Sequence, residues 1–336
     1  MNKASMHLWG GAIVAWAGLT VAISRAASPE GAQEQALQYR HSGVAHSSLF
    51  GLSMERDRGI AVGTLGSILV THDAGQSWEP QNSPNEDVAL LDVAIAGKYA
   101  IAVGQLGKII VREEAGWREI SNDASGRLLT VDINASGQAL IGGEFGAVLY
   151  SSDGGRSWMS VRPDWQSIAD PALLATAEPH IYGVDVDSEG TFTVVGEFGA
   201  ILQSTDSGKT WMARRAPKAD APTFFGLHQG NRSSATSFVV GQKGALMKSI
   251  DGGATWAPIN ANSGANLLGV SANDAGTVVV TAMRSMLISE DSGNSWVQVS
   301  NQDIESNWYL DVAHSGQGEK FYAVGHSSRI IEIGRK

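Results

Sequence analysis

A unit of about 40 residues recurs along the chain, and it constrains the fold more than any other feature. Residues 143–158, GEFGAVLYSSDGGRSW, form one complete copy, with a Gly-x-x-Gly turn, an alternating apolar run and a closing Ser-x-Asp-x-Gly-x-Ser-Trp. Self-similarity at this period is typical of arrays, solenoids and propellers. The other copies, the last three of them degenerate, occupy residues 63–78, 196–211, 241–256, 104–117, 281–296 and 325–333.

Each unit also carries an apolar segment upstream of its turn, such as LLDVAI at residues 90–95 or IYGVDV at residues 181–186. A second strand ending near Ala-Val-Gly follows, then the turn, a third strand, the closing box and a fourth strand. Such short runs, bounded by Gly, Asp and Ser, indicate β-strands. Four strands in each of seven units predict an all-β fold, a seven-bladed β-propeller.

The seventh unit supplies only three strands before the chain ends at Lys336. Residues 36–39, ALQY, stand upstream of the first apolar segment. Residues 296–299, WVQV, stand in the same way upstream of the last apolar segment. We therefore expect this N-terminal strand to close the last blade by pairing with residues 329–333.

The first 26 residues are typical of a secretory signal peptide. Lys3 gives a basic start, residues 8–23 are uncharged and mostly apolar, and Ser24-Arg25-Ala26 has the small-x-small pattern of a cleavage site. A retained membrane anchor is the alternative, although the apolar run is shorter than the about 20 residues that a span requires. We expect residues 1–26 to be a signal peptide, residues 27–35 a flexible N-terminus and residues 36–336 a single propeller, secreted to the periplasm.

Composition excludes several kinds of site and partner. The chain has no cysteine, so it has no disulfide, no thiolate metal site and no lipid-modified cysteine. Its 24 basic residues fall to 22 once Lys3 and Arg25 leave with the signal, against 34 acidic residues. This acidic balance disfavours nucleic acid or an anionic bilayer as the principal partner.

The closing box has a structural explanation. An Asp carboxylate can accept hydrogen bonds from backbone N–H groups just ahead of it, and the following Gly can take a left-handed backbone. Five equivalent carboxylates around a ring cannot all serve one catalytic or metal site. We interpret as structural box residues Asp73, Asp153, Asp206, Asp251 and Asp291, with Trp78, Trp158, Trp211, Trp256 and Trp296.

The boxes SSDGGRSW, STDSGKTW and SIDGGATW resemble the Asp-box, or BNR, repeat. Combined with the Ala-Val-Gly turns, they make residues 36–333 similar to the photosystem II stability/assembly factor-like propellers. This resemblance implies a non-enzymatic scaffold without a cofactor, which helps to assemble or stabilise a membrane protein complex. The implied partner is an integral membrane protein or complex at the outer side of the inner membrane, bound by a propeller monomer. In hosts without photosynthesis, relatives are expected to assist export machinery.

A sialidase-like or other glycan-binding or glycan-cleaving propeller is the alternative. Sialidase chemistry needs three arginines, a Tyr–Glu pair and an Asp acid, and the usual Arg-Ile-Pro motif is absent. SGKT at residues 207–210 lacks the upstream Gly of a phosphate loop, because Gln203 stands there. The eight histidines have no metal-ligand spacing.

Antiparallel strands place the boxes on one face of the ring, and the Gly-x-x-Gly turns with the interblade loops on the other. We expect a partner to bind this second face, unless its turn residues are merely solvated. The residue after the first Gly of each turn is a candidate contact, namely Thr64, Gln105, Glu144, Glu197, Gln242, Ala282 and His326.

Two further segments belong to the same candidate surface. The longest insertion, residues 161–180, carries Trp165, which the repeat does not explain. Residues 213–222, ARRAPKADAP, supply the densest basic cluster, with Arg214, Arg215 and Lys218. Long loops in compact domains are often functional. Our hypothesis is that Trp165, Arg214 and Arg215 anchor the partner.

Overall fold

The computed structural model describes residues 33–34, 37–84, 86–124, 126–169, 171–173, 178–230 and 234–334. The chain divides into two compact units, Met1–Glu30 and Gly31–Lys336, and all of these residues belong to the second. The predicted signal peptide lies outside them. No helix in the described part is both long and apolar enough to cross a bilayer.

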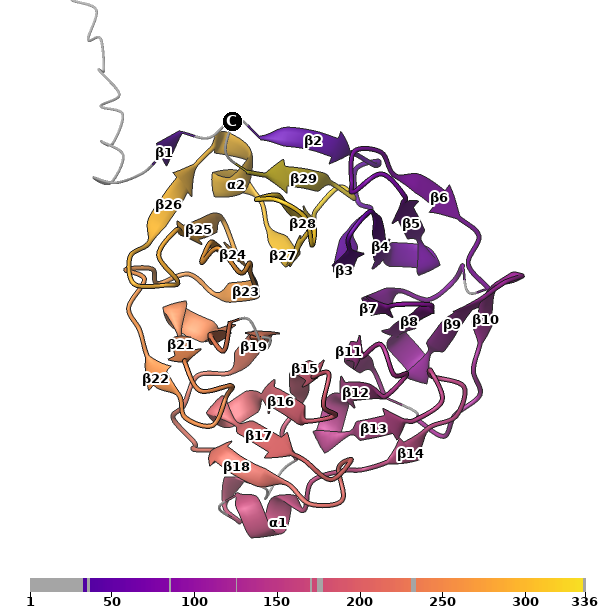
Figure 1. Ribbon diagram of the computed structural model, residues 1–336, viewed down its shortest axis with the longest axis vertical. Helices are drawn as coiled ribbons and strands as arrows, with labels where there is room; N and C mark the ends of the chain where they lie inside the picture. The colour runs from indigo at the N-terminus through magenta and orange to yellow at the C-terminus, as the bar shows by residue number, and fades with distance from the viewer. Residues whose placement is uncertain are drawn as a thin grey trace, which may run out of the picture. The chain divides into compact units, whose positions relative to one another are not determined.

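Seven antiparallel sheets form the second unit, arranged as the blades of a ring (Figure 1). The inner strand of each blade lies beside that of the next, and β27 contacts β3, so the ring is closed. This confirms the predicted seven-bladed β-propeller. From blade 1 to blade 7, the inner strands are β3 (Leu49–Glu55), β7 (Leu90–Ala96), β11 (Leu128–Ile133), β15 (Ile181–Val186), β19 (Phe224–His228), β23 (Leu267–Ala272) and β27 (Tyr309–His314).

The next two strands of each blade run outward from the inner strand. The second strands are β4 (Arg58–Gly63), β8 (Tyr99–Gly104), β12 (Ala139–Gly143), β16 (Phe192–Gly196), β20 (Ser237–Gly241), β24 (Val278–Ala282) and β28 (Phe321–Gly325). The third strands are β5 (Ile68–Thr71), β9 (Ile109–Glu113), β13 (Val148–Ser151), β17 (Ile201–Ser204), β21 (Leu246–Ser249), β25 (Ser285–Ser289) and β29 (Ile330–Ile333).

The outer strands are short, and two small helices accompany them. The helices are α1 (Trp165–Ile168) and α2 (Gln302–Ser306). The outer strands are β6 (Glu79–Gln81), β10 (Gly116–Glu119), β14 (Met159–Ser160), β18 (Met212–Arg215), β22 (Ala257–Pro258), β26 (Val297–Ser300) and, in blade 7, β2 (Gln38–His41).

The apolar side chains of one blade pack against those of the next. One core joins Ile101 and Val111 of blade 2 to Leu128 and Ile141 of blade 3, and similar clusters fill the other junctions. A blade therefore buries its faces only between two neighbours, which is why the ring must close.

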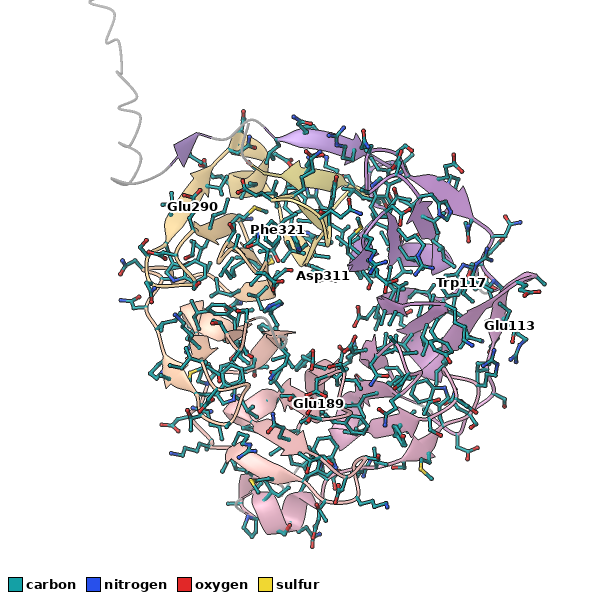
Figure 2. The ribbon with its side chains drawn as sticks, viewed as in Figure 1. Glu113, Trp117, Glu189, Glu290, Asp311 and Phe321 are labelled. Atoms are coloured by element: carbon teal, nitrogen blue, oxygen red, sulfur yellow. The ribbon has the colours of Figure 1, made fainter. Side chains whose placement is uncertain are left out.

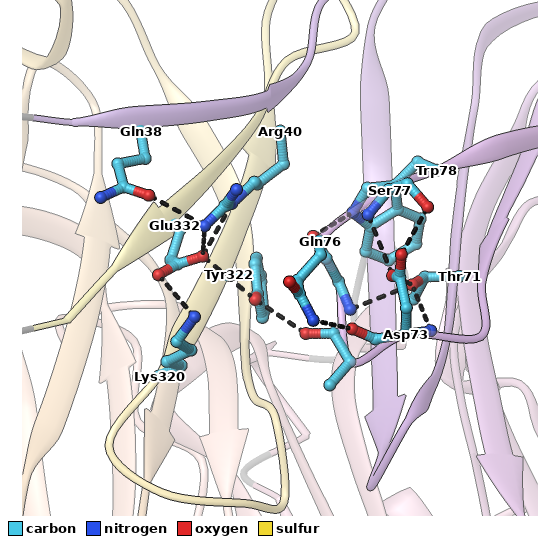
Figure 3. A network of polar contacts seen from close by, with 12 residues as sticks. Gln38, Arg40, Thr71, Asp73, Gln76, Ser77, Trp78, Lys320, Tyr322 and Glu332 are labelled. Carbon is cyan, nitrogen blue, oxygen red and sulfur yellow. Dashed lines mark hydrogen bonds and ion pairs between the residues drawn. The ribbon is translucent and has the colours of Figure 1, made fainter.

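The N-terminal strand closes the ring as predicted. β2 pairs antiparallel with β29, with Gln38 opposite Glu332. The observed strand begins two residues later than the predicted ALQY at residues 36–39. Arg40 forms an ion pair with Glu332, and Lys320 binds the other carboxylate oxygen at 3.0 Å (Figure 3). Thus three charged side chains from both ends of the chain secure the latch.

A second contact lies upstream of this latch. Strand β1 (Gln33–Glu34) pairs in parallel with β26 of blade 6. The sequence predicts a flexible segment at residues 27–35, whereas Gln33 and Glu34 pair with Val299 and Ser300. The edge strand of blade 6 offers unpaired backbone groups that a passing chain can bond.

The closing boxes form the same hydrogen-bonded turn in five blades. In blade 1, Asp73 accepts hydrogen bonds from the Ser77 N–H at 2.9 Å, the Ser77 hydroxyl at 2.6 Å and the Thr71 hydroxyl at 2.7 Å. The Thr71 oxygen in turn accepts from the Gly75 N–H, and Trp78 donates to the Gly75 carbonyl (Figure 3). These bonds, led by that from Ser77, lower the pKa of Asp73 to about 2.

The other four boxes repeat this arrangement around Asp153, Asp206, Asp251 and Asp291. Trp158, Trp256 and Trp296 also bond the carbonyl of their own box glycine, whereas Trp211 donates to Val161 of the insertion. Every box carboxylate is therefore occupied by its own turn, as a structural function requires. We call the side of the ring that carries these boxes the box face, and the opposite side the loop face.

Candidate protein-binding face

Five turn residues on the loop face hold the chain that leads into the inner strand. The N–H of Gln105 donates to the Ala89 carbonyl at 3.1 Å, and its side-chain oxygen accepts from the Ala89 N–H at 3.4 Å. A Cβ on the preceding Gly104 would lie 2.2 Å from that carbonyl, so the turn requires glycine there. Equivalent pairs are Thr64 with Ser48, Glu144 with Arg127, Glu197 with His180 and Gln242 with Thr223.

Blade 6 departs from the predicted alignment, whereas His326 of blade 7 keeps its predicted position and donates its N–H to the Trp308 carbonyl at 3.3 Å. Ala282 is buried at the end of β24, and Met283 makes the backbone bond to Asn266 instead. The turn of blade 6 is shorter, so the position shifts by one residue. His326 packs edge-on against Tyr309 with a centroid distance of 5.5 Å, and burial lowers its pKa. Neither Ala282 nor His326 offers its side chain freely to a partner.

The next residue of the turn faces solvent in blades 1 to 3 and is half-buried in blade 4. Its backbone is left-handed, with φ between 54° and 56° at Leu65, Leu106, Phe145 and Phe198. Leu65 is 71% exposed, Leu106 72% and Phe145 54%. A bulky residue in this conformation costs about 1–2 kcal/mol relative to the right-handed region, and Gly or Asn would fit better. We call Leu65, Leu106, Phe145 and Phe198 the apolar arc, which spans blades 1 to 4.

Blades 5 and 6 place basic residues at this left-handed position. Lys243 has φ of 54° and Arg284 has φ of 56°, and both side chains are exposed. The loop face therefore has an apolar half and a basic sector beside it. Sequence reasoning missed this position, although Leu-Gly and Phe-Gly in a tight turn were a usable signal.

A second apolar ring surrounds the mouth of the central channel on the loop face. It comes from the second residue of each inner strand, where every side chain is half-buried. Tyr182 stacks edge-on against Phe225 at 5.4 Å, and Phe145 of the apolar arc stacks against His180 at 5.0 Å. The mouth residues are Phe50, Leu91, Leu129, Tyr182, Phe225, Leu268 and Leu310.

The channel below this mouth has a volume of about 490 Å³ and is acidic. Asp311, at the inner edge of the ring in Figure 2, accepts from the Leu52 N–H of blade 1 at 2.7 Å. Asp92 accepts from the Val131 N–H of blade 3 at 2.8 Å. Because inner strands are sheet edges, their N–H groups need such partners. These carboxylates thus join neighbouring blades.

Asp132 makes the same kind of bond to the Val186 N–H, at 2.7 Å. Burial raises the pKa of Asp92 to about 6, that of Asp132 to about 7 and that of Asp311 to about 8. Burial, with the charges of Asp132 and Asp187, also raises the pKa of Asp185. Asp185 Oδ2 has no hydrogen-bond partner among the described residues. The described channel lining contains no arginine, so the three-arginine cluster of a sialidase is not found there.

The described part of the insertion, residues 161–169, 171–173 and 178–180, includes Trp165, which is not an exposed anchor. Trp165 begins α1, is 1% exposed and packs with Val148, Ile181 and Leu202. A Cβ on Gly146 would lie 2.4 Å from its indole nitrogen, so the ring fills the space under the blade 3 turn. Our hypothesis for Trp165 was therefore wrong: its large apolar surface fixes the insertion to the core.

The basic cluster is also divided by the fold. Arg214 and Arg215 lie on β18 rather than in a loop, at an irregularity in the pairing of β18 with β17. Arg214 donates to Gln203 at 2.9 Å, whereas Arg215 bonds the Gly199 carbonyl at 2.5 Å and lies 5.5 Å from the Phe224 ring. Only Lys218 is exposed beside the blade 4 turn. Trp165, Arg214 and Arg215 therefore do not form one surface.

Comparison with known proteins places this fold. Residues 164–263 match the family described as photosynthesis system II assembly factor YCF48. A structure described as YCF48 bound to D1 peptide has a TM-score of 0.68 at 15% identity, covering 91% of this chain and 99% of the other. YCF48 from Cyanidioschyzon merolae has a TM-score of 0.68 at 18% identity, covering 89% and 99%.

The WD40 repeats of RRP9 give a TM-score of 0.70 at 11% identity, with 91% of this chain and 99% of the other covered. No curated protein matches the chain. Such distant structural likeness shows a shared propeller fold rather than a shared function.

The fold and the repeated turns define a seven-bladed β-propeller with a closed ring. Within that class, the chain is similar to the photosystem II assembly factor-like propellers. The family match within blades 4 and 5 and the YCF48 structures confirm the resemblance that the repeats indicated.

Proposed function

We propose that this chain is a non-enzymatic scaffold that binds a membrane protein through its loop face and helps to assemble or stabilise its complex. The apolar arc is the observation that carries this proposal. Leu65, Leu106 and Phe145 are large, exposed and held in a left-handed backbone that favours Gly or Asn. Backbone strain of this kind persists where a function needs the side chain.

The geometry of the loop face suits a protein segment. The apolar arc and the apolar channel mouth provide buried contact area on binding, at roughly 25 cal/mol for each Å² removed from water. Lys243 and Arg284 lie at the equivalent positions of the next two blades and would attract an acidic flank. The partner is therefore a polypeptide with exposed apolar side chains next to acidic ones.

A similar propeller is known with a D1 peptide bound. By analogy, the client of this chain is a segment of an integral membrane protein, presented at the outer side of the inner membrane. The proposed compartment is the periplasm, or the thylakoid lumen in a photosynthetic host. In a host without photosynthesis, export machinery is the corresponding client.

Site-specific photocrosslinking in cells tests the proposal. A benzoyl-phenylalanine at Leu65, Leu106 or Phe145 should crosslink an integral membrane protein from the envelope. Ile250 is the matched control, because it is apolar and 73% exposed but lies in the box of blade 5. Equal crosslinking from Ile250, or capture of soluble proteins alone, would contradict a loop-face scaffold. Retention on a glycan array in place of crosslinking would favour the carbohydrate alternative.

A further inference from the structure

Blade 2 has lost its closing box, and the loss changes the surface of the box face. In blade 1 residues 63–78 span 16 positions from the turn to the tryptophan, whereas in blade 2 residues 104–117 span 14. Arg112 stands where the other blades have the box hydroxyl, such as Thr71, which is 2% exposed. A guanidinium cannot occupy that buried place without a partner, so the chain turns early and Arg112 is exposed.

A complete box normally fills the junction with the preceding blade. A Cβ on Gly75 of blade 1 would lie 2.5 Å from the Tyr322 ring of blade 7, and one on Gly293 would lie 2.7 Å from Phe238 of blade 5. No box packs in this way against Ile60, the equivalent residue of blade 1. A hollow lined by Ile60, Val70 and Trp117 remains between blades 1 and 2 instead.

A larger hollow of about 510 Å³ continues from blade 2 toward blade 3. The two hollows share Arg58, Lys98, Tyr99 and Arg112, so they form one recessed surface across three blades. Figure 2 labels Trp117 and Glu113 on this part of the ring. We call it the blade 2 groove.

Four cations line the groove. Arg58 pairs with Glu55, and Arg156 donates to the Asp153 carbonyl at 3.0 Å, so each is held in place. Lys98 Nζ lies 5.2 Å from the Tyr99 ring centre. Arg112 makes no hydrogen bond or ion pair with any described residue, so its guanidinium is available to a partner.

The acidic residues nearby compensate only part of this charge. Glu113 is paired with Arg118 at 2.9 Å, and Glu114 is exposed. The groove is therefore a basic site on a chain whose formal net charge is −10. Its position on the box face separates it from the loop face.

We propose that the blade 2 groove binds an acidic, extended peptide segment. The four cations come from three consecutive blades and line the larger hollow, which adjoins the apolar hollow of Ile60 and Trp117, so an extended chain that carries both carboxylates and apolar side chains fits this surface better than a small anion. The floor of Ile60, Tyr99 and Trp117 receives apolar side chains between the acidic ones. A flat anionic bilayer could contact the rim but would not enter a recess between blades. With two faces occupied, the propeller would join two polypeptides.

Fluorescence anisotropy with a defined probe tests the groove directly. A fluorescein-labelled decapeptide of alternating Glu and Val should bind the purified propeller, and binding should weaken as salt rises. Decapeptides of alternating Gln and Val, or Lys and Val, should not bind. In the variant Lys98→Gln/Arg112→Gln/Arg156→Gln, the Kd should rise at least tenfold.

The matched control is Lys209→Gln/Lys248→Gln, which removes two basic residues beside the boxes of blades 4 and 5 and should leave the Kd unchanged. A second variant replaces residues 112–117 by the blade 3 sequence of residues 151–158, which would rebuild a box and fill the groove. It should also abolish binding, with a circular dichroism melt to verify its fold. If it does not fold, the triple variant still decides.

Three results would overturn the proposal. They are unchanged binding by the triple variant, equal loss in the Lys209/Lys248 control, and binding of anionic phosphatidylglycerol vesicles without binding of the acidic peptide. Because the variants leave every loop-face residue in place, failure here would leave the proposed loop-face function unaffected.

Discussion

The Tyr322 hydroxyl donates a hydrogen bond of 2.7 Å to the carbonyl of Ala74, which joins the last blade to the box of the first (Figure 3). The same hydroxyl lies 3.3 Å from Glu332, which is also held by Arg40 and Lys320. Ring closure thus depends on a polar network as well as on the pairing of β2 with β29.

The closure bond predicts a measurable loss in the variant Tyr322→Phe. The Ala74 carbonyl would lose its partner, and the free energy of unfolding should fall by about 1 kcal/mol. Urea denaturation measures this change. Tyr182→Phe is the control, because the Tyr182 hydroxyl has only a 3.4 Å contact with His180. An equal effect of both changes would show that the closure bond is unimportant.

The box carboxylates predict an acid-dependent stability. Hydrogen bonds from Thr255 lower the pKa of Asp251 to about 2, below the about 3.9 of an unfolded chain. A depressed carboxyl pKa contributes stability above pH 4, and this stability is lost as the pH falls toward 2. Asp251→Asn should therefore lower the Tm at pH 6, with a difference that shrinks near pH 2. A constant difference across thermal melts at pH 2 to 6 would exclude this cause.

The channel acids predict the opposite dependence. Burial raises the pKa of Asp185 above its unfolded value, so its contribution to stability is lost as the pH rises above about 4. Asp185→Asn should raise the Tm at pH 8 by more than at pH 4, because it removes a charge whose Oδ2 has no partner among the described residues. Thermal melts of both proteins at pH 4, 6 and 8 measure the difference. A larger gain at pH 4 would reverse the assignment.

The insertion predicts contrasting effects for two aromatic residues. Trp165→Ala removes a fully buried ring and should cost about 3–5 kcal/mol. Phe145→Ala removes an exposed ring and should change stability by less than about 0.5 kcal/mol. Denaturation and limited proteolysis of residues 161–180 distinguish the two. Comparable stability of both variants would contradict the burial of Trp165.

The apolar arc predicts a trade between stability and binding. Leu106 has φ of 56°, and Asn tolerates this conformation better. Leu106→Asn should raise the free energy of unfolding by up to about 1 kcal/mol while reducing photocrosslinking to the client from Phe145. Unchanged crosslinking would indicate that Leu106 does not contact the partner.

The limits of prediction follow from the range of the interactions. The alignment of blade 6 was wrong by one residue because a shorter turn at Met283 is invisible in the spacing of Thr281 and Trp296. The left-handed positions were overlooked because their importance appears only when Leu65 and Leu106 are seen to be exposed. The blade 2 copy is visibly degenerate in the sequence. The residues around it do not show, however, which surface of the neighbouring blades is left uncovered by the missing box.

The sequence by itself determined the blades, their boxes and the latch, because each rests on strand patterns or on hydrogen bonds within about four residues, as between Asp73 and Ser77. Tertiary structure decided which side chains a partner can reach. Trp165 is covered by the blade 3 turn, and Arg214 and Arg215 are each held by a different partner, Gln203 and the Gly199 carbonyl. The exposure of a side chain depends on the neighbouring blades that pack against it. Those blades are far away in the sequence, so the residues next to it do not reveal this packing.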